Sequence, residues 1–311
     1  MALANDSLVT EFILLGLTEQ PDLQIPLFLI FLVTYVITAF GNSILIILIV
    51  LNPHLHTPMY FFLFNLSFID LCYSSLITPK MLMNFIQEKN IISYRGCMTQ
   101  FYFFGFFAIS ECYVLTAMAY DRYVAICNPL LYRVAMSPKT CSYLMFGSYS
   151  MGLTGALIHT GCVLRLIFCD GNTINHYFCD LLPLLQLSCS STYVNEIELL
   201  IVTGKDIIVP TVIIFTSYGF ILSSIFKIQS TAGRSKAFST CSSHIIAVSM
   251  FFGSSAFMYL KPSSAVSMDE AKFSSIFYSI VVPMMNPIIY SLRNKDVKVA
   301  FKRTQNRMFK S

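Results

Sequence analysis

The chain has 311 residues, of which 56% are hydrophobic and only 12% are charged, and its formal net charge is +4. A soluble domain carries about 25% charged residues, so this composition excludes an ordinary water-soluble protein and makes lipid the expected solvent. The small basic excess has no accompanying motif that favours nucleic acid as a partner.

Seven apolar stretches are long enough to cross a bilayer, which requires about 20 residues as an α-helix. Unbroken apolar runs favour helices over a barrel, in which apolar and polar residues alternate. We therefore predict an all-α membrane protein, a single domain over residues 1–311 that is built as a seven-transmembrane helix bundle. The expected spans are about 25–51, 58–84, 97–126, 141–165, 197–226, 237–260 and 272–292.

The positions of the basic residues predict how the chain is oriented. The first 23 residues contain no Lys or Arg, whereas seven follow residue 292. By the positive-inside rule, residues 1–24 are expected to be extracellular and residues 293–311 cytoplasmic. Asn5 begins an Asn-Asp-Ser sequon in the outer segment and is a predicted glycosylation site. The tail mixes apolar and basic residues, which predicts a short amphipathic helix on the inner leaflet.

Four polar residues from four predicted helices lie at similar depth in the membrane: Asn42, Asp70, Glu111 and Asn286. Two carboxylates that lie close together in a low dielectric cannot both ionise cheaply without a cation or a shared proton. One interpretation is a sodium or proton site that changes with conformational state. The other is a hydrogen-bonded polar knot that holds the helices in register with one acid neutral.

The segment Met118–Cys127 (MAYDRYVAIC) places Asp121 and Arg122 at the inner end of the third predicted helix. A charge at the edge of an apolar run is either functional or costly. The pair therefore predicts a polar switch at this edge.

Four cysteines lie in the predicted outer segments, where disulfides can form: Cys97, Cys169, Cys179 and Cys189. Four cysteines allow three pairings, and the sequence alone does not separate them. Three of the four lie in the long connection 166–196. Long connections are often functional, so we expect this one to be a stapled lid over the outer mouth.

The sequence does not favour two other classes of membrane protein, transporters and enzymes. A transporter also uses acids within the membrane, but inverted repeats and paired broken helices are not evident in the sequence. An enzyme is not expected, because the sequence has no nucleophile–base or metal-ligand constellation, and its five histidines are scattered.

The ordered motifs resemble those of rhodopsin-like G protein-coupled receptors, and specifically the tetrapod-type class of vertebrate odorant receptors. The matching segments run from end to end: Gly41-Asn42, Leu55–Leu63 (LHTPMYFFL), Pro79–Leu82 (PKML), Met118–Cys127, Ser217-Tyr218, Lys236–His244 (KAFSTCSSH) and Pro283–Asn294 (PMMNPIIYSLRN). The resemblance implies a plasma-membrane receptor for a small, largely apolar volatile odorant. It also implies a heterotrimeric G protein of the stimulatory olfactory type as the partner, with a rise in cyclic AMP.

The resemblance also assigns roles to individual residues. It implies the disulfides Cys97–Cys179 and Cys169–Cys189. No cofactor is required, but an allosteric Na⁺ at Asp70 and Glu111, with Asn42 and Asn286 nearby, becomes the favoured interpretation of the polar layer. Arg122 would be held by Asp121 at rest and would engage the G protein when helix six swings outward. The switch residues are then Asp121, Arg122, Tyr123, Tyr218, Lys236, His244 and Tyr290.

The ligand is expected among the outer halves of helices three, five, six and seven. The candidates are Phe104, Gly105, Ala108, Ile109, Val202, Asp206, Phe252, Ser255, Tyr259, Ile276 and Ser279. The chain departs from the family at two places. Phe252 replaces a tyrosine that the family usually has, which removes a hydroxyl from the expected pocket floor. Lys205-Asp206 is an unusual charged pair for this stretch of helix five.

Two interpretations of Asp206 remain open at this point. Asp206 could face the cavity and favour polar or amine-bearing odorants. Alternatively, it is protonated or paired with a neighbour, while the Lys205 side chain extends toward the membrane surface.

Overall fold

The computed structural model describes residues 9–18, 20–87, 89–169, 171–260, 267–293 and 295–308, without the side chains of 232, 236, 239, 240, 291–293, 295, 307 and 308. The predicted glycosylation site Asn5 and the side chain of Lys236 therefore lie outside the described part.

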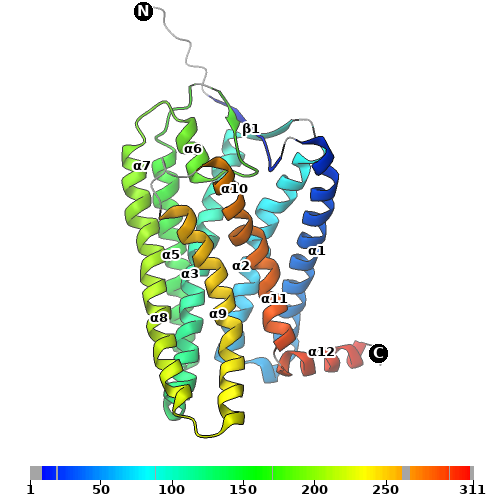
Figure 1. Cartoon of the computed structure of the whole chain (residues 1–311), viewed down its shortest axis with the longest axis vertical. Helices are drawn as coiled ribbons and strands as arrows, with labels where there is room; N and C mark the ends of the chain where they lie inside the picture. Colours follow the sequence, from blue (N-terminus) through cyan, green and yellow to red (C-terminus); the bar gives the residue numbers. More distant parts are fainter. Residues whose placement is uncertain are drawn as a thin grey trace, which may run out of the picture.

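Seven long helices stand side by side in this part of the chain (Figure 1). Two of them contain a π-helical stretch. The fifth long helix in chain order, called helix five and distinct from the element α5, runs through α7, η3 and α8. The seventh, called helix seven, runs through α10, η5 and α11. The bounds are α1 (Pro21–Leu51), α2 (Pro58–Asn84), α3 (Tyr94–Cys127), α5 (Pro138–Val163), α7 (Tyr193–Glu198), η3 (Leu199–Thr203), α8 (Gly204–Phe226), α9 (Thr231–Tyr259), α10 (Met268–Ile276), η5 (Phe277–Val281) and α11 (Val282–Arg293). The predicted seven-helix bundle is confirmed.

Short elements lie at the two ends of the bundle. They are the short pieces η1 (Pro53–Leu55), η2 (Pro129–Leu131), α4 (Tyr132–Ala135) and α6 (Leu181–Leu187), and the longer α12 (Lys295–Met308). Figure 1 shows that the chain turns after α11, so that α12 lies at one end of the bundle and runs outward from it. Val297 and Ala300 of α12 are buried, while Lys298 and Lys302 are exposed. The helix predicted after the seventh span is therefore present and amphipathic.

A small sheet closes the opposite end. The strand β1 (Glu11–Leu14) pairs antiparallel with β2 (Asn90–Ser93) and parallel with β3 (Thr173–Ile174). Phe12 on β1 is fully buried and packs edge-on against Phe168. We call this the sheet end and the other the α12 end.

The surface of the bundle is apolar and several polar groups are inside, which is the arrangement of a multi-pass membrane protein. Ile30, Val212 and Phe215 are more than half exposed, whereas Asp70 and Glu111 are fully buried. Six of the described helices are long and apolar enough to cross a membrane: Pro21–Leu51, Pro58–Asn84, Tyr94–Cys127, Tyr193–Phe226, Cys241–Tyr259 and Met268–Tyr290. The remaining long helix of the bundle, α5, is also long enough to cross a membrane, but it is rich in Ser, Thr and Gly.

Several helices begin earlier than their apolar runs predict. Serine side chains cap the first turns of α3, α5, α9 and α10 by accepting backbone N–H groups, namely Ser93, Ser137, Ser230 and Ser267. A serine cap satisfies an N–H group that has no partner within the helix, so polar residues that follow the cap join the helix. Sequence windows of apolar residues miss these turns, which is why α9 starts at Thr231 and not near 237.

The helix α3 occupies the middle of the bundle, where it packs against α2, α5, α8 and α9. Its residues therefore contribute both to sites near the sheet end and to sites near the α12 end.

Candidate functional site

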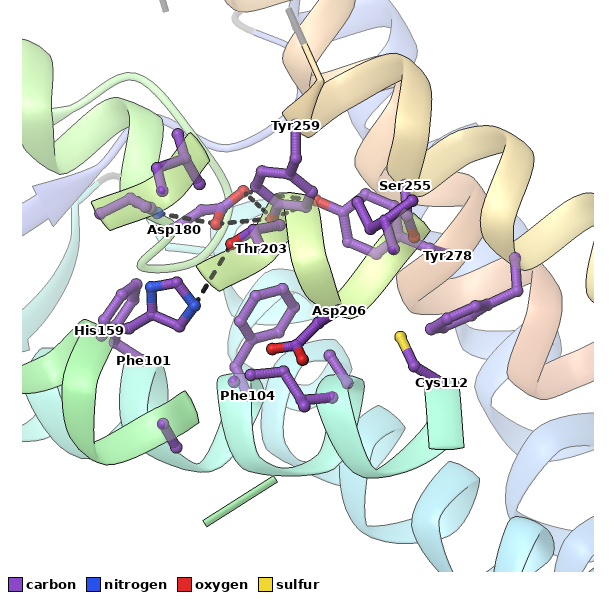
Figure 2. A pocket seen from close by; sticks show the side chains of 18 residues that line it. Phe101, Phe104, Cys112, His159, Asp180, Thr203, Asp206, Ser255, Tyr259 and Tyr278 are labelled. Carbon is purple, nitrogen blue, oxygen red and sulfur yellow. Dashed lines mark hydrogen bonds between the residues drawn. The ribbon is translucent and has the colours of Figure 1, made fainter. Parts of the chain in front are cut away.

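A cavity of about 80 Å³ lies between the helices in the half of the bundle near the sheet end. It is lined mainly by apolar and aromatic side chains from α3, α5, helix five, α9 and helix seven, with Asp180 and Leu181 from the connection after α5. The lining residues are Phe101, Phe104, Gly105, Ala108, Ile109, Cys112, Ala156, His159, Asp180, Leu181, Leu199, Thr203, Asp206, Ile207, Phe251, Ser255, Tyr259 and Tyr278 (Figure 2).

Seven of the predicted ligand residues line this cavity, and four do not. Those that line it are Phe104, Gly105, Ala108, Ile109, Asp206, Ser255 and Tyr259. Val202, Phe252, Ile276 and Ser279 do not line it, whereas Thr203, Phe251 and Tyr278 do.

The π-helical stretches explain two of the displaced positions. Residues of an α-helix repeat every 3.6 positions, and a π-turn inserts an additional residue. The stretch η3 includes Val202 and Thr203, and η5 includes Tyr278 and Ser279. In each stretch the neighbour of the predicted residue faces the cavity. Ser279 is fully buried and bonded to Tyr177 instead, at 2.9 Å between the hydroxyl oxygens.

Phe252 and Ile276 are displaced for simpler reasons. Adjacent helical residues point about 100° apart, and in α9 Phe251 takes the cavity position while Phe252 packs into the hydrophobic core. Ile276 lies before η5 and packs partly buried against the core.

Asp180 is the functional candidate that the sequence did not reveal. Its carboxylate accepts the Leu181 backbone N–H at 2.7 Å and the Tyr259 hydroxyl at 3.0 and 3.2 Å, and the Tyr278 hydroxyl donates to it at 3.3 Å. Burial raises the pKa of Asp180 to about 6 despite these hydrogen bonds. Its position beside Cys179 was the available signal, because the disulfide fixes this stretch over α3.

The connection between α5 and α7 is the predicted lid, and two disulfides hold it in place. Cys97 is bonded to Cys179 and Cys169 to Cys189, the pairing that the resemblance implies. The Gln100 side chain accepts the Cys179 backbone N–H at 2.9 Å, which adds a second tie between α3 and the lid. The predicted stapled lid is therefore present, and it contributes Asp180 and Leu181 to the cavity.

A polar layer lies deeper in the bundle. The Asn286 amide donates to Asp70 Oδ2 at 2.9 Å, and the Asn42 amide donates to the Pro283 carbonyl at 3.0 Å. Five buried oxygens of the layer have no hydrogen-bond partner in the described part of the chain: Asn42 Oδ1, Asp70 Oδ1, Glu111 Oε1, Glu111 Oε2 and Asn286 Oδ1. Buried oxygens without donors are costly, so the layer suits a bound cation or a proton.

The donor set of this layer also fits a hard cation. Among the described residues, no three His, Cys, Asp or Glu side chains are placed to hold a metal ion. A cation here would therefore use amide oxygens of Asn42 or Asn286 beside the two carboxylates. Hard cations take oxygen ligands, so the residues present fit Na⁺.

The predicted switch residues lie at the α12 end of α3. Arg122 bonds Asp121 Oδ2 from both Nε, at 3.1 Å, and Nη2, at 2.5 Å, and the Tyr132 hydroxyl donates to Asp121 Oδ1 at 2.7 Å. Asp121 is fully buried, so its pairing keeps a charge from being stranded in the bundle.

The other switch residues surround this pair. Tyr218 and His244 join α8 to α9 through a 2.6 Å contact between the hydroxyl oxygen and Nδ1. Tyr123 is half-buried and its ring lies 5.9 Å from that of Phe220. Tyr290 is buried, and its hydroxyl has no hydrogen-bond partner among the described residues.

The cavity, the polar layer and the switch therefore follow one another along α3. Glu111 precedes the cavity residue Cys112, and Arg122 lies about 15 Å further along the helix at 1.5 Å per residue. Movement of α3 at the cavity would reach both other sites.

Comparison with known proteins identifies the family of this fold. A family model described as olfactory receptor matches residues 31–307. Olfactory receptor 8B3 of Homo sapiens is 69% identical over 97% of this chain and 96% of the relative. Olfactory receptor 8B8 of Homo sapiens is 66% identical over 99% of each chain. The crystal structure of squid rhodopsin superposes with a TM-score of 0.71 at 19% identity, over 93% of this chain and 87% of that chain, which shows the shared fold alone.

Proposed function

The chain belongs to the olfactory receptor family of rhodopsin-like receptors, and on this premise we propose which ligand and which G protein it uses. It binds a small, largely apolar volatile molecule in the cavity near the sheet end. Binding activates a heterotrimeric G protein of the stimulatory olfactory type at the α12 end, and cyclic AMP rises.

The placement of the cavity and Arg122 on the same helix carries this proposal. Ligand sites are typically concave and mostly apolar with a few polar groups that orient the ligand, and this cavity has that composition. At the other end of α3, Arg122 is bound to Asp121 within its own helix and has no bond to the side chains of α9 that the structure describes. Displacement of α9 would expose Arg122 to a partner without first breaking a bond to any of these described side chains.

A cyclic AMP assay tests the coupling. Cells that express the receptor are challenged with an odorant panel, with and without the stimulatory olfactory G protein. We expect odorant-dependent cyclic AMP only when this G protein is present. The variant Arg122→Ala should lose the response while its surface expression persists, and Arg165→Ala, an exposed arginine near the sheet end, should keep it. A response that does not depend on the G protein would contradict the proposed coupling.

We also propose that the protein resides in the plasma membrane with the sheet end outside. The basic residues concentrated in the tail favour a cytoplasmic α12 end, and the two disulfides near the sheet end suit an oxidising exterior. An epitope inserted before residue 9 of the receptor tests this orientation, because an antibody should reach it on intact cells. Labelling that requires permeabilised cells would overturn it.

The polar layer is proposed to bind Na⁺ as an allosteric ion. Asp70 and Glu111 would hold the ion, with amide oxygens of Asn42 and Asn286 completing its ligands. The bound ion would offset one of the two buried carboxylate charges. In its absence, a shared proton would have to serve the same purpose.

A further inference from the structure

The charges around the cavity define which ligands it accepts. Two carboxylates line it, those of Asp180 and Asp206, together with His159, and none of the described lining residues is Lys or Arg. The His159 ring is paired with Glu198, at 2.8 Å between Nδ1 and Oε1. An anionic ligand would therefore meet like charges in a low dielectric, which is unfavourable. A cation or a hydrogen-bond donor would meet acceptors.

The two carboxylates differ in how many of their acceptor sites are used. Both oxygens of Asp180 already accept hydrogen bonds, from Tyr259, Tyr278 and the Leu181 N–H. Asp180 is thus satisfied by the protein itself and leaves little for a ligand. Figure 2 shows the Asp180–Tyr259 group at one side of the cavity and Asp206 at another.

Asp206 is satisfied at one oxygen only. Its Oδ1 accepts the Tyr113 hydroxyl at 2.7 Å and lies 2.9 Å from Nζ of Lys205. Its Oδ2 has no partner among the described residues, although the side chain is only 2% exposed. A buried acceptor without a donor costs free energy, and a ligand donor would recover it.

Lys205 approaches the carboxylate from outside the cavity. Its side chain is 45% exposed and does not line the cavity. Lys205 therefore contacts the carboxylate without occupying the ligand's space. Asp206 thus lines the cavity, as the first interpretation requires, and is also paired with neighbours through Oδ1, as the second requires. The Lys205 ammonium contacts this carboxylate and does not extend away from it toward the membrane surface.

We propose that the ligand carries a protonated amine, which donates to Oδ2 of Asp206 while its apolar body packs against Phe104, Ile109 and Phe251. This inference names the ligand class of the proposed receptor function and rests on it. Alkylamines, like the Lys side chain, are protonated at neutral pH. A charge-assisted bond is stronger than a bond from a neutral donor, so the cavity prefers an amine to an alcohol of the same shape.

Matched sets of odorants test the proposal. Each set has one carbon skeleton, linear, branched or cyclic, as the amine, the alcohol and the carboxylate, for example isoamylamine, isoamyl alcohol and isovalerate. In the cyclic AMP assay the amine should be the most potent member and the carboxylate the least. Equal or greater potency of the alcohol or the carboxylate would overturn the proposal, and so would responses to other odorants but to no amine.

Variants connect the preference to one atom. Asp206→Asn should raise the half-maximal concentration for amines by about ten-fold or more, because the charge-assisted bond is lost, and should leave alcohols nearly unchanged. Asp269→Asn, an exposed carboxylate in the first turn of α10, is the matched control and should change neither. Retained amine potency in Asp206→Asn would overturn the proposal.

A second variant, Lys205→Gln, distinguishes loss of the charge-assisted bond from a folding defect in Asp206→Asn, because its expected effect has the opposite direction. It removes the competing positive charge, so amines should become more potent, and a loss of amine potency would overturn the proposal. A receptor that reaches the surface but responds to no odorant at all would contradict the proposed function rather than the amine preference.

Discussion

The phenolic oxygen of Tyr218 on α8 lies 2.6 Å from Nδ1 of His244 on α9, and Nε2 of the same ring lies 3.1 Å from the Leu115 carbonyl oxygen on α3. A carbonyl only accepts hydrogen bonds, so Nε2 carries the proton. In the neutral ring Nδ1 then accepts from the Tyr218 hydroxyl. One side chain therefore connects three helices about two turns from Arg122.

We predict that His244→Phe raises the basal activity of the receptor. Loss of the two bonds removes about 1 kcal/mol each from the state in which α9 is packed against α3, so basal cyclic AMP should increase about five-fold or more. The control His54→Phe replaces an exposed histidine at the same end of the bundle and should leave it unchanged. Normal surface expression with unchanged basal activity would refute this role for His244.

The polar layer yields a second prediction. If Na⁺ binds between Asp70 and Glu111 and favours the resting state, replacing sodium by choline at constant ionic strength should lower the agonist concentration needed for nucleotide exchange in membranes. Asp70→Asn should abolish this dependence, because the carboxylate holds the ion. A wild-type receptor that is indifferent to sodium, combined with a strong loss of thermal stability in Asp70→Asn, would favour the alternative of a structural polar knot.

The sequence predicts the cavity best where the helix is regular. Phe104, Gly105, Ala108 and Ile109 all lie on the uninterrupted α3, and each lines the cavity as expected. On helix five Val202 does not line the cavity and Thr203 does, because a π-helical stretch changes which residue faces it. No apolar pattern signals such a stretch, since it depends on how neighbouring helices pack.

Long-range polar contacts show a similar division. The shared depth of Asp70 and Asn286 follows from helix length alone, and the two side chains are bonded. The place of Asp180 does not follow in this way, because a loop residue has no periodicity. It requires knowledge of the Cys97–Cys179 bond and of the two tyrosines that converge on its carboxylate.

The lid provides a prediction about how the stability of the receptor depends on pH. Stability is measured as the thermal unfolding midpoint in detergent. Burial raises the pKa of Asp180 from 3.8 to about 6, so the folded state binds its proton more tightly than the unfolded state. Its contribution to the free energy of unfolding is fully present below pH 3.8 and is lost as the pH rises through about 6. As the pH falls through this window, the unfolding midpoint of the wild type should therefore rise relative to that of Asp180→Asn. A difference that does not depend on pH would contradict it.

His176 in the same lid has the opposite sign and must be separated from this effect. Burial lowers the pKa of its ring from 6.5 to about 3, so its contribution is present above pH 6.5 and is lost as the pH falls toward 3. The two groups offset each other in the wild type. In His176→Gln, acidification should consequently favour the folded state more than it does in the wild type.

The contact between α3 and α5 allows a test of packing with a control on the same helix. A Cβ added at Gly152 would lie 2.6 Å from the Phe106 carbonyl oxygen and closer still to the Ser110 hydroxyl, whereas one added at Gly147 meets nothing within 4 Å. Gly152→Ala must push α5 away from α3, and overpacking of this kind costs about 1–3 kcal/mol. Gly147→Ala should be neutral or slightly stabilising, since Ala is favoured over Gly within helices. The measurement is the thermal unfolding midpoint of the two purified variants, and equal midpoints would show that the helices separate at no cost.

The same variant connects the packing to the polar layer. Because Ser110 precedes Glu111, a displaced α3 should also weaken the response to sodium in Gly152→Ala.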